Sequence, residues 1–456
     1  VYPFANSDIR FWSALCFAAV AVLLGGFLLV QAIFTWLANR RKAADREPTV
    51  EELEASAMKM VFDRGLKVIR NRWSGDGKGL YGLPWYLVVG RAESGKSSLI
   101  ENSDLRFPID HEIDLELRDL ADRKAAGFFR WRVAGNEAVL LDLNGEYFRV
   151  DKERTSVQNV LWDKFLSNLQ RIRPRRPVNG VVLAIDFAEF LGMTEAERDE
   201  YSRQVRGIVN ELVERLGTRM TIHLTFTKLD QVAGFKDFFA TLSAADRDML
   251  YGFHFLCEGH HTPEWLTQFE TQYEEYLERL HLRLKKKMLE LKSASSRQEA
   301  FSFYRVFLGL EEPLRSFLEA ALSPDKFTTP PLVRGVYFLS NRQENAPRNA
   351  FLEAVGERYA IPDPLYGTSQ GSSYPYFVNN FLKKVVFPEA GLAGDNQKAV
   401  ERYRKQMAAA AVLVLVVCLG GGLYWNNRYE ANLAYANDVL NKTRDFTGRG
   451  LRVTYD

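Results

Sequence analysis

The stretch Leu87-Val88-Val89-Gly90-Arg91-Ala92-Glu93-Ser94-Gly95-Lys96-Ser97-Ser98 decides how the fold of this 456-residue chain is interpreted. It contains the pattern G-x-x-x-x-G-K-[ST], preceded by an apolar run typical of a β-strand and followed by a helix start at residues 99–101. Glycines at the two ends of the pattern let the backbone curl, so that successive N–H groups point at a phosphate chain. Lys96 would reach the β- and γ-phosphates, and Ser97 would bind Mg²⁺ at the positive end of the helix dipole. The predicted nucleotide contacts in this P-loop are Gly90, Glu93, Ser94, Gly95, Lys96, Ser97 and Ser98.

The composition is that of a folded protein without a marked charge preference. Hydrophobic residues make up 46% of the chain, which is enough to form a core, and the formal net charge of +2 gives no reason to expect nucleic acid or an acidic substrate. The length suggests two or three domains. The three cysteines, Cys16, Cys257 and Cys418, do not indicate a disulfide framework and fit a reducing compartment for most of the chain.

Two uncharged stretches indicate membrane spans. Residues 11–37 are long enough to cross the hydrocarbon core as a helix, and residues 407–425 are just long enough. The first stretch is not a signal peptide, because no basic region or small-residue cleavage site accompanies it. A buried core helix is the alternative for the second stretch, since its three glycines at 420–422 disfavour a helix.

Basic residues set the expected orientation of the spans. Residues 40–42 (Arg-Arg-Lys) follow the first span, and Arg402, Arg404 and Lys405 precede the second. Because such clusters stay in the cytoplasm, we expect residues 38–406 to be cytoplasmic and both termini to lie across the membrane. The chain begins at Val1 and ends without a finished domain, which we interpret as a piece of a longer membrane protein.

Between the spans, apolar runs alternate with helical patterns. The runs at residues 85–90, 138–142, 181–186 and 222–226 are typical of strands, and ligands of parallel sheets bind beyond the carboxyl ends of the strands. We predict a membrane-anchored α/β fold: a P-loop GTPase-like parallel sheet with helices on both faces, plus an inserted or appended helical subdomain. The expected parts are a periplasmic segment at 1–10, a transmembrane helix at 11–37, a cytoplasmic linker helix at 38–79, the GTPase-like domain at 80–262, the helical subdomain at 263–330, the last strand with a helical extension at 331–400, a basic flank and transmembrane helix at 401–425, and the start of a periplasmic domain at 426–456.

Two further motifs lie at strand ends. Asp142-Leu143-Asn144-Gly145 matches D-x-x-G, in which the Asp reaches Mg²⁺ and the Gly N–H senses the γ-phosphate. Thr227-Lys228-Leu229-Asp230 resembles the [NT]-K-x-D element of GTPases, whose Asp accepts hydrogen bonds from the guanine edge while the Lys stem packs on the ring. Each motif is weak alone, but three elements in this order predict a GTPase-like site for Mg²⁺ with GTP, or with ATP. The predicted contacts beyond the P-loop are Gly145, Thr227, Lys228 and Asp230 for the nucleotide, and Ser97 and Asp142 for Mg²⁺.

Two parts expected for fast hydrolysis are missing. No threonine occurs between Ser98 and Asp142, so the threonine that completes the Mg²⁺ shell in small GTPases has no counterpart. Glu146 stands where a water-orienting glutamine is expected, and its carboxylate would repel γ-phosphate oxygens unless it acts as a base or turns away. Glu146 is a weak catalytic candidate, and we expect nucleotide binding with slow hydrolysis.

Other clusters indicate structure rather than chemistry. Cys257, His260 and His261 lack a nearby fourth ligand, which favours a surface loop over a metal site. The four arginines within residues 171–176 indicate a solvated loop or a protein contact rather than nucleic acid. Aromatic residues at helical spacing in 265–284 indicate core packing rather than a cofactor site.

The chain resembles the TssM/IcmF family, the inner-membrane component of bacterial type VI secretion systems, with a homologue in type IVB secretion. The resemblance covers nearly the whole chain and rests on blocks beside the motifs. The chain departs from the family pattern in two places. Residues 142–146 are DLNGE instead of D-T-A-G-R, and residues 125–129 are AAGFF instead of a threonine-bearing stretch. Both departures argue against hydrolysis of the nucleotide rather than against its binding. The matching blocks are Leu83-Pro84-Trp85-Tyr86, NSDLRFP at 102–108, GFKDFF at 234–239, RGVYF at 334–338 and FPEAGLAG at 387–394.

The resemblance implies a scaffold in the bacterial inner membrane, with a GTPase-like cytoplasmic domain, a helical extension and a large periplasmic domain that begins near Asn426. The implied partners are a TssL-type inner-membrane protein, a TssJ-type outer-membrane lipoprotein that binds the missing periplasmic domain, baseplate and tail components on the cytoplasmic side, and further copies of the chain, with no nucleic acid. Two alternatives are an NTPase that powers assembly by hydrolysis and a membrane GTPase that anchors another targeting complex.

Overall fold

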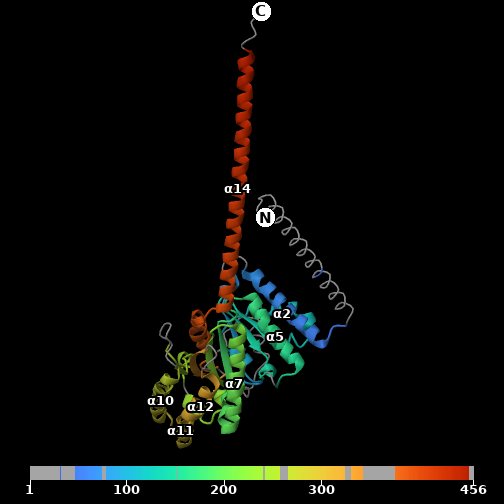
Figure 1. Cartoon of the computed structure of the whole chain (residues 1–456). Helices are drawn as coiled ribbons and strands as arrows, with labels where there is room; N and C mark the ends of the chain where they lie inside the picture. The colour runs from blue at the N-terminus through green and yellow to red at the C-terminus, as the bar shows by residue number, and fades with distance from the viewer. Residues whose placement is uncertain are drawn as a thin grey trace, which may run out of the picture.

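The protein folds around a seven-stranded mixed sheet (Figure 1). The computed structural model describes residues 31, 47–73, 79–150, 153–239, 242–256, 265–323, 330–341 and 375–450. The strand order is β2-β3-β1-β4-β5-β7-β6. The five parallel strands are β1 (Trp85–Val89), β3 (Ala138–Leu143), β4 (Gly180–Asp186), β5 (Thr221–Thr227) and β7 (Leu332–Phe338), and almost all their residues are buried, as their apolar runs predict.

The predicted parallel sheet is confirmed for these five strands, and the prediction is wrong at both edges. β2 (Phe129–Ala134) pairs antiparallel with β3, and β6 (Gly252–His254) pairs antiparallel with β7. The chain reverses between β2 and β3 in a tight turn, where Gly135 has a φ of 47°. The turn joins β2 and β3 in a hairpin, which is an antiparallel connection by necessity.

The sheet has its topological switch point at β1. β3 pairs with one edge of β1 and β4 with the other, so the chain crosses from one half of the sheet to the other beside this strand. The loop that follows β1 therefore opens into the crevice where ligands of doubly wound sheets bind.

Adjacent residues of single strands show which helices cover which face. Trp85 packs against Trp131, on the side covered by α2 and α5, whereas Tyr86 packs against Phe387. Because neighbouring strand residues point to opposite faces, the segment before α14 covers the face opposite α2 and α5. The helices are α2 (Val50–Trp73), α3 (Lys96–Glu101), α4 (Asp110–Glu116), α5 (Ser156–Ile172), α6 (Phe187–Gly192), α7 (Glu195–Leu216), α8 (Phe235–Phe239), α9 (Ala244–Arg247), α10 (Trp265–Glu290), α11 (Ala294–Leu308), α12 (Glu311–Leu322) and α14 (Gln397–Gly450), with a π-helical turn, η7 (Phe381–Val386), and a 3₁₀ turn, η8 (Pro388–Leu392).

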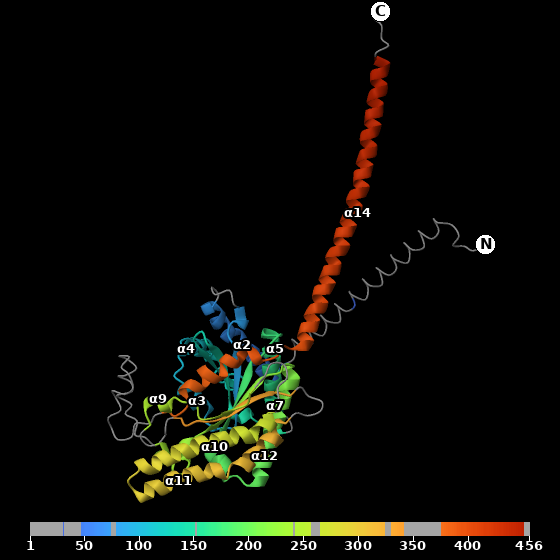
Figure 2. The same cartoon turned by 90° about the vertical axis from the view of Figure 1, so that its left-hand side faces the viewer.

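Helices α10 to α12 lie between β6 and β7 in the chain and form a unit beside the sheet (Figure 2). The aromatic stripe of α10 is buried, as its helical spacing predicts. Phe253 of β6 packs edge-on against Tyr273, and Phe338 of β7 stacks on Tyr276. The unit therefore packs on the sheet through aromatic side chains.

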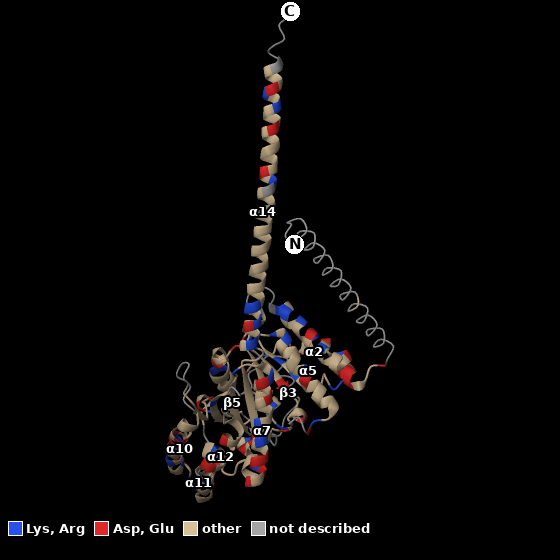
Figure 3. Ribbon diagram, viewed as in Figure 1, with Lys and Arg blue, Asp and Glu red and all other residues tan. Residues whose placement is uncertain are grey.

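Helix α14 projects away from the rest of the molecule (Figure 1). Its charged residues lie near both ends, and residues 406–427 between them carry no charge (Figure 3). The apolar part has a mean hydropathy of 2.3 and no buried residues, and α14 is the one helix in the described part of the chain that is long and apolar enough to cross a membrane. The three glycines at 420–422 continue the helix. The predicted first span, residues 11–37, lies outside the described residues except for Gln31.

The segment that enters α14 is fixed at the amino-terminal end of the parallel strands. The backbone N–H of Asn396 donates to the carbonyl of Arg175 at 2.8 Å, and the side-chain amide of Asn396 donates to Leu216 O at 2.8 Å. Asp395 accepts from Arg175 at 2.6 Å and from Arg176 at 2.9 Å. Arg173 is buried between the rings of Tyr81 and Trp85, and Arg171 pairs with Asp63. All four arginines of the predicted basic run thus make contacts within the chain.

Candidate functional site

The P-loop connects β1 to α3 in a conformation that glycine permits. Gly95 has a φ of 77°, and a Cβ there would lie 3.1 Å from both Asn341 Nδ2 and Thr227 Oγ1. A Cβ at Gly90 would collide with the carbonyl oxygen of Ala184. The two glycines of the motif are therefore required by a left-handed turn and by close packing on β4.

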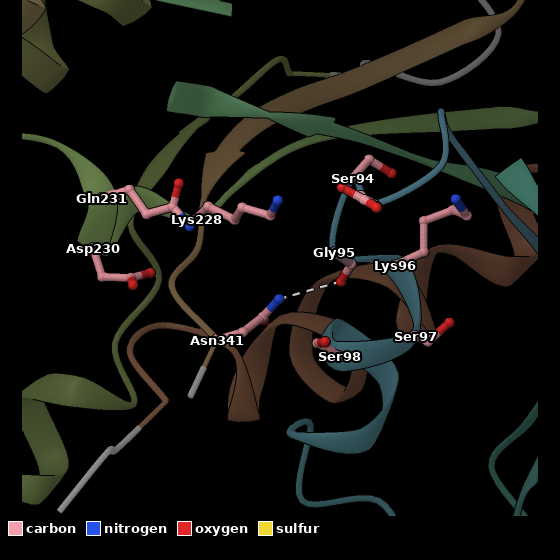
Figure 4. Close-up of a pocket in the computed structure, with 10 residues that line it drawn as sticks. Ser94, Gly95, Lys96, Ser97, Ser98, Lys228, Asp230, Gln231 and Asn341 are labelled. Atoms are coloured by element: carbon pink, nitrogen blue, oxygen red, sulfur yellow. Dashed lines mark hydrogen bonds between the residues drawn. The ribbon is translucent and has the colours of Figure 1, made fainter. Parts of the chain in front are cut away.

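The loop borders a cavity of about 460 Å³, a size suited to a small ligand. Figure 4 shows the loop residues on one side of this cavity and Lys228, Asp230 and Gln231 on the other. The lining residues are Glu93, Ser94, Gly95, Lys96, Ser97, Ser98, Lys228, Asp230, Gln231 and Asn341. Six of the seven residues predicted in the P-loop line this cavity. Gly90 does not, and neither do Asp142, Gly145 and Thr227, which were also predicted as contacts of Mg²⁺ or the nucleotide.

Lys96 folds back on its own loop. Its ammonium group donates to the carbonyl of Gly90 at 2.9 Å and to that of Arg91 at 2.7 Å. Burial lowers the pKa of Lys96 to about 8 from its ordinary 10.5, and the nearby Asp142 carboxylate opposes the shift. The charge of Lys96 is thus held in a partly desolvated position, where a polyphosphate would stabilise it.

Ser97 and Asp142 meet at the ends of α3 and β3, as the sequence predicts for an Mg²⁺ site. The Ser97 hydroxyl donates to Asp142 Oδ2 at 2.7 Å. Burial raises the pKa of Asp142, against the hydrogen bond from Ser97 and the charge of Lys96. The other carboxylate oxygen, Oδ1, is buried without a hydrogen-bond partner. A buried, unsatisfied carboxylate oxygen beside a hydroxyl fits a hard cation, because Mg²⁺ prefers oxygen ligands.

Gly145 lies directly on the P-loop. A Cβ at this position would collide with the backbone nitrogen and Cα of Ala92, so no larger residue fits. The following residue, Glu146, is exposed and is not among the residues that line the cavity. Its backbone N–H donates to the Asn144 side chain at 3.1 Å. The structure thus places Gly145 beside the phosphate loop and leaves Glu146 outside the cavity.

Thr227 is hydrogen-bonded to the backbone of the P-loop. It is fully buried, and its hydroxyl contacts Ser94 O at 2.6 Å and Ile185 O at 3.2 Å. It is not among the residues that line the cavity, although it was predicted as a nucleotide contact. Thr227 therefore joins the end of β5 to the loop.

Lys228 and Asp230 line the side of the cavity opposite the loop. Lys228 has a φ of 58°, and its ammonium group lies 2.8 Å from Asp186 Oδ2, so its stem is held across this edge of the sheet. Asp230 Oδ1 accepts a hydrogen bond from the Ser340 hydroxyl at 2.6 Å. An acidic side chain fixed in this way presents hydrogen-bond acceptors to a ligand in the cavity.

Ser340 and Asn341, which hold this side of the site, were missed by the sequence analysis, as was Gln231. Asn341 donates to Gly95 O at 3.2 Å, and its own side-chain oxygen is buried without a partner. The signal was available: residues 340–341 follow the last parallel strand, and the ends of parallel strands meet at one edge of the sheet. A Ser-Asn pair at that position is a pair of hydrogen-bonding groups facing the switch point.

No group of three or more metal-ligating side chains occurs within the described ranges. Cys257, His260 and His261 lie outside them. The sheet order, the loop after β1 and the side chains at the strand ends define an α/β protein with a P-loop.

The family is shown by sequence. Residues 155–414 match the profile of the IcmF-related N-terminal domain, and since the match spans more than half of the chain, the chain belongs to the TssM/IcmF family. Over 400 residues it is 31% identical to the type VI secretion system component TssM1 of Pseudomonas aeruginosa. That alignment covers 85% of this chain and 35% of the relative, so the chain spans about a third of the relative's length.

Two solved structures are distant neighbours. A GTP-binding protein from Sulfolobus solfataricus in complex with GDP is 14% identical, with a TM-score of 0.19 over 39% of this chain and 51% of that one. An S. thermophilus NFeoB T35A mutant bound to GDP is 11% identical, with a TM-score of 0.20 over 52% of this chain and 98% of that one. Both scores are too low to add to the fold assignment, which rests on the sheet order and the P-loop.

Proposed function

We propose that this chain is the nucleotide-binding, membrane-anchored portion of a type VI secretion component, and that Mg²⁺ with GTP occupies the cavity beside the P-loop. The observation that carries the proposal is that Lys96, Ser97 and Asp230 line one cavity, and that Ser97 is hydrogen-bonded to Asp142 of β3. A bound nucleoside triphosphate requires a cationic side chain beside its phosphates, oxygen ligands for its Mg²⁺ and hydrogen-bonding groups beside its base.

Each residue of the phosphate side has a separate task. Lys96 would exchange its two loop carbonyls for phosphate oxygens, which are charged and therefore stronger acceptors. Gly145 allows the end of β3 to approach the loop closely enough for its N–H to reach the phosphate side. Ser97 and Asp142 would hold Mg²⁺, which when bound neutralises phosphate charge.

The residues proposed to contact the base, Lys228 and Asp230, favour guanine over adenine. Guanine presents two donors, N1–H and the 2-amino group, to which an aspartate offers two acceptor oxygens. The Ser340 hydroxyl keeps Asp230 in place, and the Lys228 stem would pack along the ring.

Hydrolysis is expected to be slow. The chain has no threonine between Ser98 and Asp142, and Glu146, where a water-orienting glutamine is expected, lies outside the cavity. The nucleotide would thus act as a ligand that stabilises one state of a scaffold, rather than as a fuel for assembly.

The wider role is proposed from the family. Residues 11–37 and α14 would anchor a cytoplasmic domain in the bacterial inner membrane, with residues 38–406 cytoplasmic and the termini periplasmic. The GTPase-like domain at 80–262, the helical subdomain at 263–330 and the extension at 331–400 are the proposed cytoplasmic parts. The proposed partners are a TssL-type inner-membrane protein, a TssJ-type lipoprotein reached through a periplasmic domain, baseplate and tail components, and further copies of the chain.

The test is Mg²⁺-dependent GTP binding and turnover by the whole chain in detergent. The account predicts binding that Lys96→Ala weakens at least about 100-fold, from the loss of a charge-assisted contact, with turnover near background in both proteins. Lys164→Ala, an exposed lysine on α5, is the matched control and leaves binding unchanged. Turnover on the order of 1 per second or faster would contradict the scaffold role and favour an NTPase that powers assembly by hydrolysis.

A further inference from the structure

The face of the domain from which α14 emerges carries an excess of basic side chains. The first turns of α14 contain Lys398, Arg402, Arg404 and Lys405, and all four side chains are exposed. Glu401 is the one acidic residue among them. The uncharged part of the helix begins at residue 406, so the last of these cations lies at the end of the proposed span.

The carboxyl-terminal end of α2 adds two more cations on the same side. Arg70 and Arg72 lie in its last turns and are exposed. Figures 1 and 2 show this end of α2 on the side of the domain from which α14 emerges, set apart from the base of α14. Two hydrogen bonds connect the segment after α2 with the start of α14. The Tyr81 hydroxyl accepts from the backbone N–H of Arg175, and the carbonyl of Arg175 accepts from the backbone N–H of Asn396.

These cations are not neutralised within the described part of the chain. None of Arg70, Arg72, Arg402, Arg404 and Lys405 forms an ion pair there. The two acidic residues of the segment 387–396, which leads into α14, are already paired with arginines. Asp395 pairs with Arg175 and Arg176, and Glu389 with Arg334. The surface around the base of α14 is therefore positively charged.

We propose that Arg70 and Arg72 form, together with the basic first turns of α14, a surface that binds anionic phospholipid headgroups. The inference rests on the proposed membrane span of α14. Residues 397–405 rise about 13 Å along the helix, which leaves the domain within roughly one to two Debye lengths of the headgroups. Cations at that distance are attracted to an anionic leaflet, and each contributes on the order of a fivefold gain in binding. The surface would hold the sheet in a fixed orientation against the bilayer.

The test is amide hydrogen exchange in the last turn of α2, measured on the whole chain in nanodiscs. One set contains phosphatidylcholine alone, and the other contains equal parts of phosphatidylcholine and phosphatidylglycerol. Exchange at residues 70–73 is expected to slow on the order of fivefold or more in the anionic discs. The difference disappears in 1 M salt, because the Debye length falls to about 3 Å.

Matched variants separate the surface from a general charge effect. The double variant Arg70→Gln/Arg72→Gln loses the lipid-dependent slowing, and Lys285→Gln/Lys286→Gln, two exposed lysines on α10 far from α14, keeps it. Equal exchange in the two lipids, with the protein incorporated in both, overturns the inference. Equal slowing by DNA in phosphatidylcholine discs would assign the surface to nucleic acid and also overturn it. Failure to incorporate into either disc would instead refute the span on which the inference rests.

Discussion

At the residue scale, the site depends on a few side chains whose geometry the contacts define closely. Lys96 and Asp142 are both buried, and burial shifts both pKa values toward the neutral form. Each group is therefore costly in its charged state until a ligand of opposite charge arrives. This arrangement favours a polyphosphate with its cation over either one alone.

The pH dependence of GTP binding follows from Lys96. Because its pKa in the free protein is about 8, the lysine is charged below that pH and loses its proton as the pH rises through it. GTP affinity is expected to stay constant from pH 6.5 to 7.5 and to fall about tenfold per pH unit above 8, until the higher pKa of the bound state is reached. Titration calorimetry at constant ionic strength measures this. An affinity that does not change up to pH 9.5 would contradict the role of the lysine.

Gly145 provides a steric test of the contact between β3 and the P-loop. Gly145→Ala forces a Cβ against the backbone of Ala92 and is expected to cost about 1–3 kcal/mol of stability and to weaken GTP binding by displacing the loop. Gly192→Ala is the control, since a Cβ there meets nothing within 4 Å. Thermal unfolding and nucleotide binding are measured on both variants. Equal melting temperatures would refute the close packing.

The sequence predicted the contiguous parts of the site but not the assembled ones. The P-loop and Asp142-Leu143-Asn144-Gly145 are recognisable because their chemistry resides in neighbouring residues. Ser340 and Asn341 contribute through the position of β7 in the sheet, and Thr227 through hydrogen bonds to carbonyls beneath the loop. Such contacts depend on the register of strands far apart in the chain, which no local pattern contains.

At the scale of elements, the sequence predicts the parallel strands at the centre of the sheet but not the two edge strands. The strands of the core are buried on both faces and appear as continuous apolar runs, whereas β6 is three residues long and has too little pattern to detect. The insertion of α10 to α12 was visible from the change to a helical period. The pairing of the run at 171–176 with Asp395 and other carboxylates required the fold, because the partners lie far away in sequence.

The ion pair of Arg334 and Glu389 links β7 to the segment that leads into α14. Arg334 donates to both oxygens of Glu389, at 2.9 and 2.7 Å, and to Phe255 O at 2.9 Å. Its side chain is only 8% exposed. Glu389→Gln would remove this negative charge from beside the buried guanidinium and is expected to cost about 3 kcal/mol.

Thermal unfolding of the whole chain measures this cost. The control is Glu200→Gln, which removes a surface partner of Arg203 at 53% exposure and is expected to change stability by no more than about 0.5 kcal/mol. Equal effects of the two substitutions would show that the pair does not fasten the segment to the sheet.

At the scale of the whole molecule, the P-loop and the base of α14 lie at opposite ends of the sheet. The cavity opens at the carboxyl ends of the parallel strands. Asp395 and Asn396, in contrast, bind Arg175, which precedes the amino-terminal end of β4. A ligand at one end is therefore separated from the proposed membrane surface by the full length of the strands. The nucleotide would face the cytoplasm, where soluble partners are available.

Orientation across the membrane is testable with introduced cysteines. In a background without the three native cysteines, Thr447→Cys on distal α14 is expected to react with a membrane-impermeant maleimide in spheroplasts. Ser295→Cys on α11 is expected to react only after permeabilisation. Labelling of position 295 in intact spheroplasts, or protection of position 447, would reverse the proposed topology.

The P-loop cavity is proposed to bind a guanine nucleotide, and the base selectivity of wild type and Asp230→Asn tests this proposal most directly. Dissociation constants for GTP, ATP and XTP are determined with Mg²⁺ on the whole chain. Wild type is expected to prefer GTP over ATP by about 100-fold or more, because two charge-assisted hydrogen bonds are lost with adenine. Asp230→Asn is expected to prefer XTP, since the asparagine amide donates to the 2-oxo group that replaces the amino group of guanine. Equal affinities for all three nucleotides in both proteins would contradict recognition of guanine by Asp230. No binding at all would leave the P-loop a purely structural feature of the fold.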